Sequence, residues 1–483
     1  MKKILSLLLM LVLAVPLSFL VSCEKQRSPA LSYEIACEYR PEHLSLTGTV
    51  KVEFKNDTER EISELKFNLY PNAYRKGALF SAVPTSMRDE VYYRGESYGG
   101  ITISSVLGAK GWEVEGEDEN ILVAELETPL FTGEKVVLDI GFTTRLAYAV
   151  HRLGVTETTV NLGHFYPILC ALTEEGFQEC VYTSIGDPFV SDAADYFVHL
   201  TLPKEYMLAA GGEMTAERTL ESKKKYTVSL TNAREFSAVL STEFKEKSDM
   251  VSGKEVKYYY LSDASPEKTL QTACEALSFY SASFGEYAYQ NYTLVETPLP
   301  YGGVEYSGLT MLGEGLSDDA KIRSVAHETA HQWWYAAVGS DQMENAWQDE
   351  GLAEYSAALF FEKHVGYGLT YASLIEESIA AYREYRRTYL ASLGWVDLRM
   401  SRPLREYLSE YEYVSVSIDK SVVMFDALKK SVGEKKFFAG LKKYYSENKF
   451  QMAKAGSLAG AFERVGVDAA GFFEGFLNGK EMI

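Results

Sequence analysis

The chain has little of what marks disordered, fibrous or membrane-embedded proteins. Its 483 residues include only 13 prolines and 36 glycines, and no low-complexity segment or internal repeat stands out. Beyond residue 22 no apolar run is long enough to cross a bilayer. These absences exclude disordered, collagen-like and multi-pass membrane proteins. With 46% hydrophobic residues at this length, we expect two or three folded domains.

Positive charge is scarce as well. The chain carries 48 Lys and Arg residues against 68 Asp and Glu, a formal net charge of −20, and no Lys/Arg cluster supplies a broad basic surface. A nucleic-acid-binding protein needs a basic surface to neutralise phosphates, so no nucleic-acid partner is predicted. The acidic balance is typical of a soluble exported protein and says little about the substrate.

Cysteine is rare, and the five cysteines form no Cys-x-x-Cys pair. We therefore expect neither a thiolate metal site nor a dithiol redox motif. Cys170 and Cys180 are close enough in sequence to form a disulfide in an exported protein. Two free thiols fit equally well, because spacing alone fixes no geometry.

Residues 1–22 are predicted to be a secretory signal rather than part of the fold. Two lysines precede an apolar run, Ile4–Val21, and the segment ends in Leu20-Val21-Ser22-Cys23. This ending resembles the bacterial lipoprotein box, in which the cysteine, here Cys23, carries the lipid and becomes the new N-terminus. The alternative is an uncleaved anchor helix with a chance cysteine. Either interpretation predicts a protein at the cell membrane, lipid-anchored in the first case, that faces outside the cytoplasm.

The next part of the chain has a periodicity of two. Between residues 31 and 250 apolar and polar residues alternate, as in Val50–Lys55 and Leu138–Phe142, with turn residues between the runs. This pattern predicts a mostly antiparallel β domain with one solvated face. We find no candidate catalytic residues in this domain and expect it to have a supporting or a binding role.

From about residue 251 helical spacing predominates. Ser265-Pro266-Glu267 carries the start signals of a helix that ends at Gly285. Further helices are predicted over residues 318–338, 348–365, 371–393, 421–432 and 434–447. The fold class is therefore α+β and multidomain. The N-terminal antiparallel β domain at 31–250 precedes a mainly helical half at 251–483, where we place the catalytic domain.

The chemistry is concentrated in His327-Glu328-Thr329-Ala330-His331. The two histidines at i and i+4 lie one turn apart on one helix face, so both imidazoles can reach the same metal ion. Glu328 projects beside this face and can take a proton from a metal-bound water. With only seven histidines in the chain, such a pattern arises rarely by chance.

Zinc in a catalytic site needs a third protein ligand and an open position for water. Glu350 follows His331 after eighteen residues, at the start of the next predicted helix. Antiparallel packing of the two helices would bring it opposite the histidine pair. Glu354, one turn further on, could accept the free ring N–H of a ligand histidine. The alternative, that the histidines only pack, is disfavoured because buried imidazoles and carboxylates need partners in an otherwise apolar helix.

These motifs resemble those of a known family. The segment His327–His331, followed after eighteen residues by Glu350, resembles the zinc site of the membrane alanyl aminopeptidase and leukotriene hydrolase family of gluzincin metallopeptidases. The resemblance implies one Zn²⁺ per chain and a thermolysin-like, mainly helical metallopeptidase domain behind an N-terminal β domain.

Upstream, Tyr301–Tyr306 resembles that family's Gly-Ala-Met-Glu-Asn motif. The substrate-binding residues that this implies are Glu305, which would bind the free α-amine of a peptide, with Gly302 and Gly303 beside it. The strand-like run Ser307–Leu312 could then pair with extended substrate backbone as an edge strand.

Three departures from the family pattern bear on function. Val304 and Tyr306 replace the usual Met and Asn, so the subsite shape differs, and the 483 residues hold no large helical C-terminal domain. Ile418 occupies the position of the family's tyrosine that hydrogen-bonds the oxyanion, and the loss of one such donor costs on the order of 3 kcal/mol. Tyr413, five residues earlier, matches a second tyrosine of some relatives. It or Tyr411 would take this role, unless both only pack.

The sequence as a whole predicts a zinc metallopeptidase, most simply an aminopeptidase, that acts on peptides with a free N-terminus outside the cytoplasmic membrane. The predicted metal ligands are His327, His331 and Glu350. Glu328 is the predicted general base, and Tyr413 is the predicted oxyanion donor. Two alternatives stay open. One is an endopeptidase that uses Glu305 differently, and the other is a zinc-binding but non-catalytic lipoprotein, which Ile418 motivates.

Overall fold

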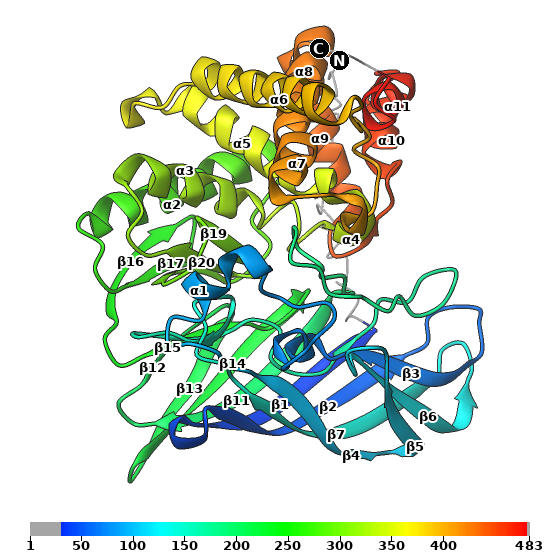
Figure 1. Cartoon of the computed structure of the whole chain (residues 1–483), viewed down its shortest axis with the longest axis vertical. Helices are drawn as coiled ribbons and strands as arrows, with labels where there is room; N and C mark the ends of the chain where they lie inside the picture. The colour runs from blue at the N-terminus through cyan, green and yellow to red at the C-terminus, as the bar shows by residue number, and fades with distance from the viewer. Residues whose placement is uncertain (1–29, 481–483) are drawn as a thin grey trace, which may run out of the picture.

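The computed structural model describes residues 30–480, so the predicted signal segment and Cys23 lie outside the described residues. In this part of the chain a strand-rich half and a helical half meet at a mixed sheet (Figure 1). No helix between residues 30 and 480 combines the length and the apolarity needed to cross a bilayer. The four cysteines of the same region, Cys170 and Cys180 among them, are free thiols.

A seven-stranded sheet dominates the strand-rich half. Its neighbouring strands run antiparallel except β1 and β11, which are parallel. Val50 and Val52 in β2 are fully buried while Lys51 between them is exposed, so the alternation seen in the sequence marks the inner face. Across the sheet the strands are β13 (Glu213–Leu220), β14 (Lys223–Ala233), β11 (Ala194–Pro203), β1 (Leu31–Arg40), β2 (Ser45–Lys55), β7 (Lys135–Arg145) and β4 (Gly100–Leu107).

Two four-stranded antiparallel sheets complete this half, which confirms the predicted β architecture. The first holds β10 (Ile168–Leu169), β3 (Ile62–Asn68), β6 (Ile121–Leu130) and β5 (Ala109–Glu115). The second holds β12 (Met207–Ala210), β15 (Ala238–Ser241), β9 (Val160–Leu162) and β8 (Leu153–Val155). A one-turn helix, α1 (Arg88–Val91), lies in the connection before β4.

A five-stranded mixed sheet supports the helical half. Its order is β16 (Lys245–Val251), β17 (Lys254–Tyr260), β18 (Asn291–Thr297), β20 (Leu309–Gly313) and β19 (Gly303–Tyr306). Within the described chain β19 pairs with β20 alone, so β19 is the edge strand. The expectation that the run Ser307–Leu312 forms the edge is wrong, because the chain reverses before Leu309 and β20 inserts between β18 and β19.

Helices α2 (Pro266–Phe284) and α3 (Asp318–Ala330) lie over this sheet (Figure 1). The helices predicted beyond residue 340 form to within two residues at each end. The helices that follow α3 are α4 (Gln342–Asn345), α5 (Glu350–Lys363), α6 (Tyr371–Leu393), α7 (Glu410–Tyr413), α8 (Lys420–Val432), α9 (Glu434–Asn448), α10 (Ser457–Arg464) and α11 (Ala470–Leu477). A parallel pair, β21 (Gly339–Ser340) and β22 (Met452–Ala453), connects the turn after α3 to the C-terminal helices.

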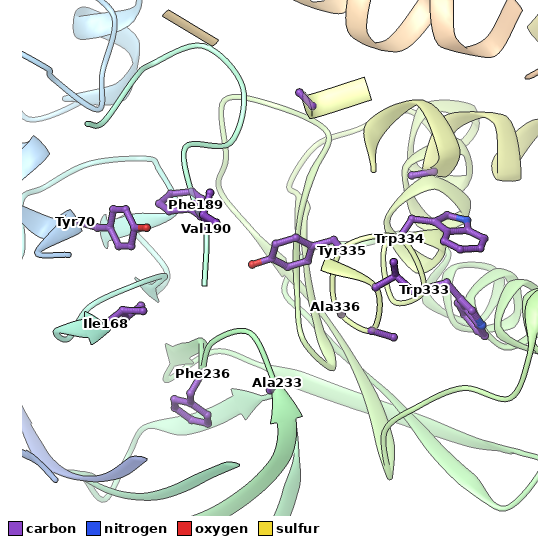
Figure 2. Packing of buried hydrophobic residues seen from close by; sticks show 14 of the residues in the cluster. Tyr70, Ile168, Phe189, Val190, Ala233, Phe236, Trp333, Trp334, Tyr335 and Ala336 are labelled. Carbon is purple, nitrogen blue, oxygen red and sulfur yellow. The ribbon is translucent and has the colours of Figure 1, made fainter. Parts of the chain in front are cut away.

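One continuous apolar core runs through both halves. A single cluster of contacting buried residues extends from Leu31 in β1 to Phe476 in α11. The turn after α3 lies where the halves meet. In it, Trp333 and Trp334 point toward the helices, whereas Tyr335 points toward the β half (Figure 2). The two halves therefore bury apolar surface against each other.

A carboxylate from the β half reinforces this junction. Glu235, which follows β14 and is fully buried, accepts a hydrogen bond from the hydroxyl of Tyr335. Its other oxygen accepts the backbone N–H of Ser307 at 2.7 Å, in the turn between β19 and β20. One side chain of the β half thus holds both the turn after α3 and the end of the edge strand.

Candidate active site

The helix that carries the histidine pair has a clear start and ends earlier than predicted. The Ser317 hydroxyl caps α3 by accepting a backbone N–H of the first turn. The helix ends at Ala330, and His331 caps it in right-handed helical conformation, which preserves the i, i+4 stacking. The predicted continuation to Val338 is wrong, because the chain turns after His331 to bury two consecutive tryptophans in the core.

Three side chains from α3 and α5 converge on one point. The Nε2 atoms of His327 and His331 lie 3.0 Å apart. The Glu350 carboxylate is 3.5 Å from Nε2 of His327 and 3.8 Å from Nε2 of His331. Glu350 is the first residue of α5, and α3 packs against α5, so the antiparallel pair brings it opposite the histidines.

The outer ring nitrogens fix the tautomer of both histidines. Nδ1 of His327 lies 2.7 Å from a Glu354 carboxylate oxygen, and Nδ1 of His331 lies 2.9 Å from the carbonyl oxygen of Trp334. Since these oxygens only accept, each Nδ1 carries the hydrogen and each Nε2 presents a lone pair. Two lone pairs and the Glu350 oxygen then face one another within 4 Å and repel unless they share a cation. Two imidazoles and one carboxylate are a typical zinc donor set, so the residues fit the metal.

The pKa values of the two histidines indicate that a positive charge between them and Glu350 is favourable. Burial lowers the pKa of His327, but the carboxylates of Glu350 and Glu354 outweigh it and raise the pKa well above the usual value. Burial and the neighbouring His327 lower the pKa of His331 to about 4, which keeps this ring neutral and able to ligate.

A second ring of charges holds the His327 imidazole. Glu354 is buried, and its Oε1 accepts two hydrogen bonds from Arg323, at 3.1 and 2.8 Å. Arg323 also donates to Glu377 at 2.9 Å. Burial raises the pKa of Glu354, but the bonds from His327 and Arg323 outweigh it and lower the pKa to about 2. The carboxylate is therefore ionised and orients the ring that would bind metal.

Glu328 lies where a general base would be needed. It is 6% exposed, and its Oε2 has no hydrogen-bond partner within residues 30–480. Gly303 on β19 leaves room for it, because a Cβ at that glycine would meet Glu328 Oε1 at 2.5 Å. Burial, opposed by His327 and reinforced by Glu350, raises the pKa of Glu328 to about 8. Such a carboxylate can both accept and return a proton near neutral pH.

The edge strand β19 brings Glu305 to the same place. Oxygen or nitrogen atoms of Glu305, Glu328 and His331 lie within 4.8 Å of one another. The Glu305 carboxylate is 7% exposed and accepts a hydrogen bond of 3.3 Å from Gln342. Burial, followed by the charges of Asp187 and Glu328, raises the pKa of Glu305 well above its usual value. An ammonium group would neutralise this crowding of carboxylates.

Tyr413 faces the same cavity from the end of α7. It is 3% exposed, and its hydroxyl has no hydrogen-bond partner among the described residues. A π-helix, Val414–Asp419, follows it, and π-helical hydrogen bonds span five residues. Tyr413 and Ile418, five positions apart, therefore both reach the cavity. Tyr411 also lies at its wall but is 44% exposed and packs edge-on against Tyr385.

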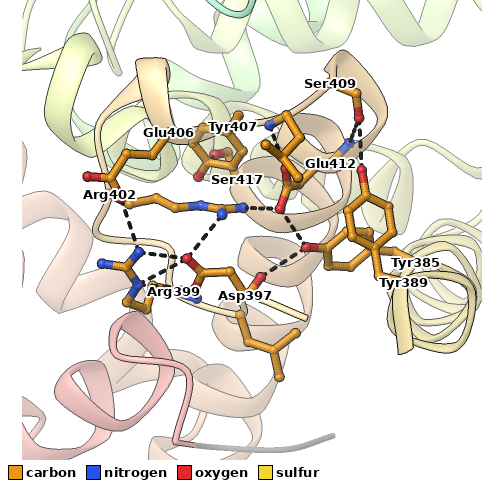
Figure 3. Close-up of polar contacts among 12 residues, drawn as sticks. Tyr385, Tyr389, Asp397, Arg399, Arg402, Glu406, Tyr407, Ser409, Glu412 and Ser417 are labelled. Atoms are coloured by element: carbon orange, nitrogen blue, oxygen red, sulfur yellow. Dashed lines mark hydrogen bonds and ion pairs between the residues drawn. The ribbon is translucent and has the colours of Figure 1, made fainter. Parts of the chain in front are cut away.

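A buried ion pair fixes the backbone next to Tyr413 (Figure 3). Glu412 is fully buried and accepts hydrogen bonds of 2.9 Å from Arg402 and 2.9 Å from the Tyr385 hydroxyl. Its second oxygen accepts the backbone N–H of Leu408 at 2.7 Å. With all these donors satisfied, the carboxylate anchors α7 to the loop before it and to α6.

The ring of Tyr413 is held through its neighbour Tyr407. The Arg402 guanidinium lies 3.9 Å from the centre of the Tyr407 ring, whose hydroxyl is 2.7 Å from Ser417 in the π-helix. The Tyr407 ring meets that of Tyr413 edge-on, with centres 5.5 Å apart. Gly186 of the β half closes the other side, since a Cβ there would lie 2.9 Å from the Tyr413 ring. The phenol is thereby aimed at the cavity.

A cavity of about 800 Å³ contains these groups, and the β half supplies part of its wall. Arg152 and Asp187 form an ion pair there, with side chains 10% and 13% exposed. The guanidinium of Arg152 also lies 5.8 Å from the ring of Tyr301, at the start of the Glu305 motif. Sequence reasoning missed both residues and expected no chemistry in this half. The β alternation carries no signal for them, since their loops reach the cavity only through long-range packing.

The matches to known proteins agree with this geometry. Residues 268–476 match the family model of the Peptidase family M1 domain. The chain is 28% identical over 177 residues to leucine aminopeptidase 2-1 of Scheffersomyces stipitis, which covers 35% of this chain and 26% of that protein. The chain thus spans about a quarter of the length of this curated relative.

Solved structures extend the likeness to the whole fold. The M1 zinc metallopeptidase of Deinococcus radiodurans superposes with a TM-score of 0.64 at 18% identity, over 94% of this chain and 95% of that one. A mutant of it bound to a Tyr-Ser-Ala substrate gives a TM-score of 0.62 at 17% identity, over 94% and 95% of the two chains. The His327–Glu350 site lies within residues 268–476, the part of the chain that matches the Peptidase family M1 domain, the family of zinc metallopeptidases that its motifs resemble.

Proposed function

We propose that this protein is a zinc-dependent aminopeptidase that removes N-terminal residues from peptides. The observation that carries the proposal is the convergence of two imidazoles and one carboxylate, with Glu328 and Glu305 beside them in one cavity. When bound at His327, His331 and Glu350, zinc would act as a Lewis acid toward the scissile carbonyl and a water molecule.

The chain's own residues supply the remaining steps. Glu305 pairs with the ammonium group of the substrate and so places the first peptide bond in reach of Glu328. Glu328 accepts a proton from the attacking water and returns it to the leaving amine. Tyr413 donates a hydrogen bond to the oxygen of the tetrahedral intermediate, in place of the missing tyrosine at Ile418.

The test compares three substrates with the purified zinc-loaded protein. An aminoacyl amide, a short peptide and the N-acetylated copy of that peptide are assayed, with Glu328→Gln as the inactive control. Cleavage of the first two substrates alone supports an aminopeptidase. Equal cleavage of the acetylated peptide would mean an endopeptidase, and stoichiometric zinc with no hydrolysis of any substrate would mean a non-catalytic member.

We also propose that a lipid on Cys23 holds the protein on the outer side of the cytoplasmic membrane. The support is the signal-like segment before Cys23 and its lipoprotein-box ending. Labelling with a radioactive fatty acid should mark the wild type but not Cys23→Ala. Equal labelling of both would refute the anchor.

A further inference from the structure

On the basis of the proposed aminopeptidase function, we propose that Gln342 is a positioning residue for the binding of the substrate's ammonium group. Its side-chain amide fixes the Glu305 carboxylate relative to Glu350, the carboxylate among the predicted metal ligands. Of the described residues, Glu305 and Glu350 line the cavity and Gln342 does not, so Gln342 acts on the substrate through Glu305. Three features support this role: the hydrogen bonds of the amide, its neutral charge and the way its helix is held.

The Gln342 amide connects two carboxylates. Its Nε2 donates to Oε1 of Glu305 at 3.3 Å and to Oδ2 of Asp349 at 2.7 Å. A side-chain amide nitrogen carries two hydrogens, so each carboxylate accepts one of them. Asp349 directly precedes Glu350, the first residue of α5. The bridge therefore sets the position of Glu305 relative to the start of the helix that carries Glu350.

Both hydrogen bonds of the Gln342 side chain are directed at the site. Gln342 is 2% exposed, and Asp349 is 1% exposed. The amide oxygen of Gln342, Oε1, is buried and has no hydrogen-bond partner within residues 30–480. The side chain thus belongs to no wider polar network, and its polar contacts serve Glu305 and Asp349 alone.

The neutral charge of the donor matters as much as its position. A lysine or arginine at this place would pair with Glu305 and compete with the ammonium group of the substrate. An amide donates a hydrogen bond and leaves the charge of the carboxylate available. Carboxylate oxygens of Glu305 and Glu328 lie within 4.8 Å of each other and repel when both are ionised. A neutral donor therefore restrains Glu305 against this repulsion and preserves its charge for the substrate.

The helix that presents Gln342 is itself fixed by the β half. Gln342 is the first residue of α4, and Oδ1 of Asp341 before it accepts two backbone N–H groups of this helix, at 3.0 and 3.2 Å. The other oxygen of Asp341 accepts a hydrogen bond of 2.9 Å from Gln178 in the β half. The β half thus holds α4, and α4 holds Glu305 through Gln342.

The experiment measures kcat and KM for leucinamide with zinc-loaded wild type and Gln342→Met. Methionine is as long as glutamine but has no N–H to donate. Glu305 contacts the ammonium group both before and during the reaction, so the loss of its support removes binding that is common to both states. We therefore expect KM to rise about tenfold, equivalent to about 1.4 kcal/mol, while kcat stays within about threefold and zinc content is unchanged.

Gln348→Met is the matched control. Gln348 is also 2% exposed, and its Nε2 donates to the Tyr444 hydroxyl at 3.0 Å and to the carbonyl oxygen of Lys454 at 3.2 Å. Its Oε1 is likewise buried without a partner in the described chain. Neither bond reaches Glu305, so this variant should keep the KM of the wild type. Gln342→Asn serves where Gln342→Met folds poorly, and it should also raise KM, since its amide is one methylene too short to reach both carboxylates.

Calorimetry tests the same role without turnover. Leucinamide and its N-acetylated copy are titrated into the zinc-loaded proteins. Leucinamide should bind about tenfold more weakly to Gln342→Met than to the wild type. The acetylated copy has no ammonium group, so its affinity should be the same for both proteins.

The outcomes separate the two proposals. Leucinamide binding that depends on Gln342, with no hydrolysis of any amide, would overturn the aminopeptidase function and keep the positioning role. Unchanged KM and unchanged leucinamide affinity in Gln342→Met would overturn the positioning role and keep the function. An equal rise of KM in Gln348→Met, or an equal loss of affinity for the acetylated copy, would show a general effect on the fold and would also overturn the positioning role. Absence of both binding and hydrolysis would overturn both proposals.

Discussion

Replacing Tyr413 by phenylalanine separates catalysis from stability at a single oxygen atom. The hydroxyl is buried and has no hydrogen-bond partner in the described chain. Burial of an unpaired hydroxyl costs about 1–3 kcal/mol, so its removal should leave stability unchanged or raise it. If the hydroxyl binds the oxyanion, its loss costs on the order of 3 kcal/mol in the transition state, about a hundredfold in kcat.

The assay combines kcat for an aminoacyl amide, zinc content and thermal unfolding of Tyr413→Phe. Tyr407→Phe is the matched comparison, because the Tyr407 hydroxyl is bonded to Ser417 at 2.7 Å. Loss of that bond should lower stability by about 1 kcal/mol. The two phenols touch the same part of the fold, yet one variant should change mainly kcat and the other mainly stability.

Two results would refute this reasoning. An unchanged kcat in Tyr413→Phe would show that the phenol does not stabilise the oxyanion, and Tyr411 would then be the next tyrosine to test. A clear drop in unfolding temperature would show that the hydroxyl has a partner in the folded protein. Unchanged zinc content is required in either case, so that the effect on kcat is not a loss of metal.

Three further predictions concern the surroundings of the site. Glu354→Gln should weaken zinc binding by about 10- to 100-fold, because the carboxylate orients a ligand imidazole; competition with a chelator measures this, and unchanged affinity would contradict the assigned role. Gly303→Ala should lower kcat by about a hundredfold, since its Cβ would lie 2.5 Å from Glu328 Oε1 and displace the base; full activity would mean that the carboxylate has room to move. Burial lowers the pKa of Lys420 to about 7, so between pH 7 and 10 the unfolded state binds more protons. Relative to Lys420→Met, the free energy of unfolding of the wild type, measured with urea, should therefore rise by up to about 1.4 kcal/mol per pH unit across this range. A difference between the two proteins that does not change with pH would contradict the shifted pKa.

The features that can be predicted from the sequence are those set by residues close to one another along the chain. The i, i+4 histidines and a carboxylate at the start of the next helix are set by helix geometry and a short connection, so their convergence follows from counting residues. The same holds for Glu354, one turn beyond Glu350. The alternation in Val50–Lys55 predicts a buried face because the pleat has a period of two.

What the sequence does not predict depends on packing at a distance. α3 stops at Ala330 because two tryptophans enter the core, although the local pattern continues to favour a helix. The π-helix after Tyr413 brings two residues five positions apart to one cavity, and no composition signal marks it. Arg152 and Asp187 reach the cavity from loops of a half whose strands carry no catalytic pattern.

The carboxylate of Glu235 has a consequence for engineering. The Glu235 side chain hydrogen-bonds both the turn after the edge strand β19 and the turn after α3. The strand-rich half therefore fixes the position of β19 relative to the histidine helix. A graft of the helical half onto another scaffold would have to provide an acid at this spot. A fragment cut down to α3 and α5 would lose the alignment between Glu305 and the predicted metal ligands.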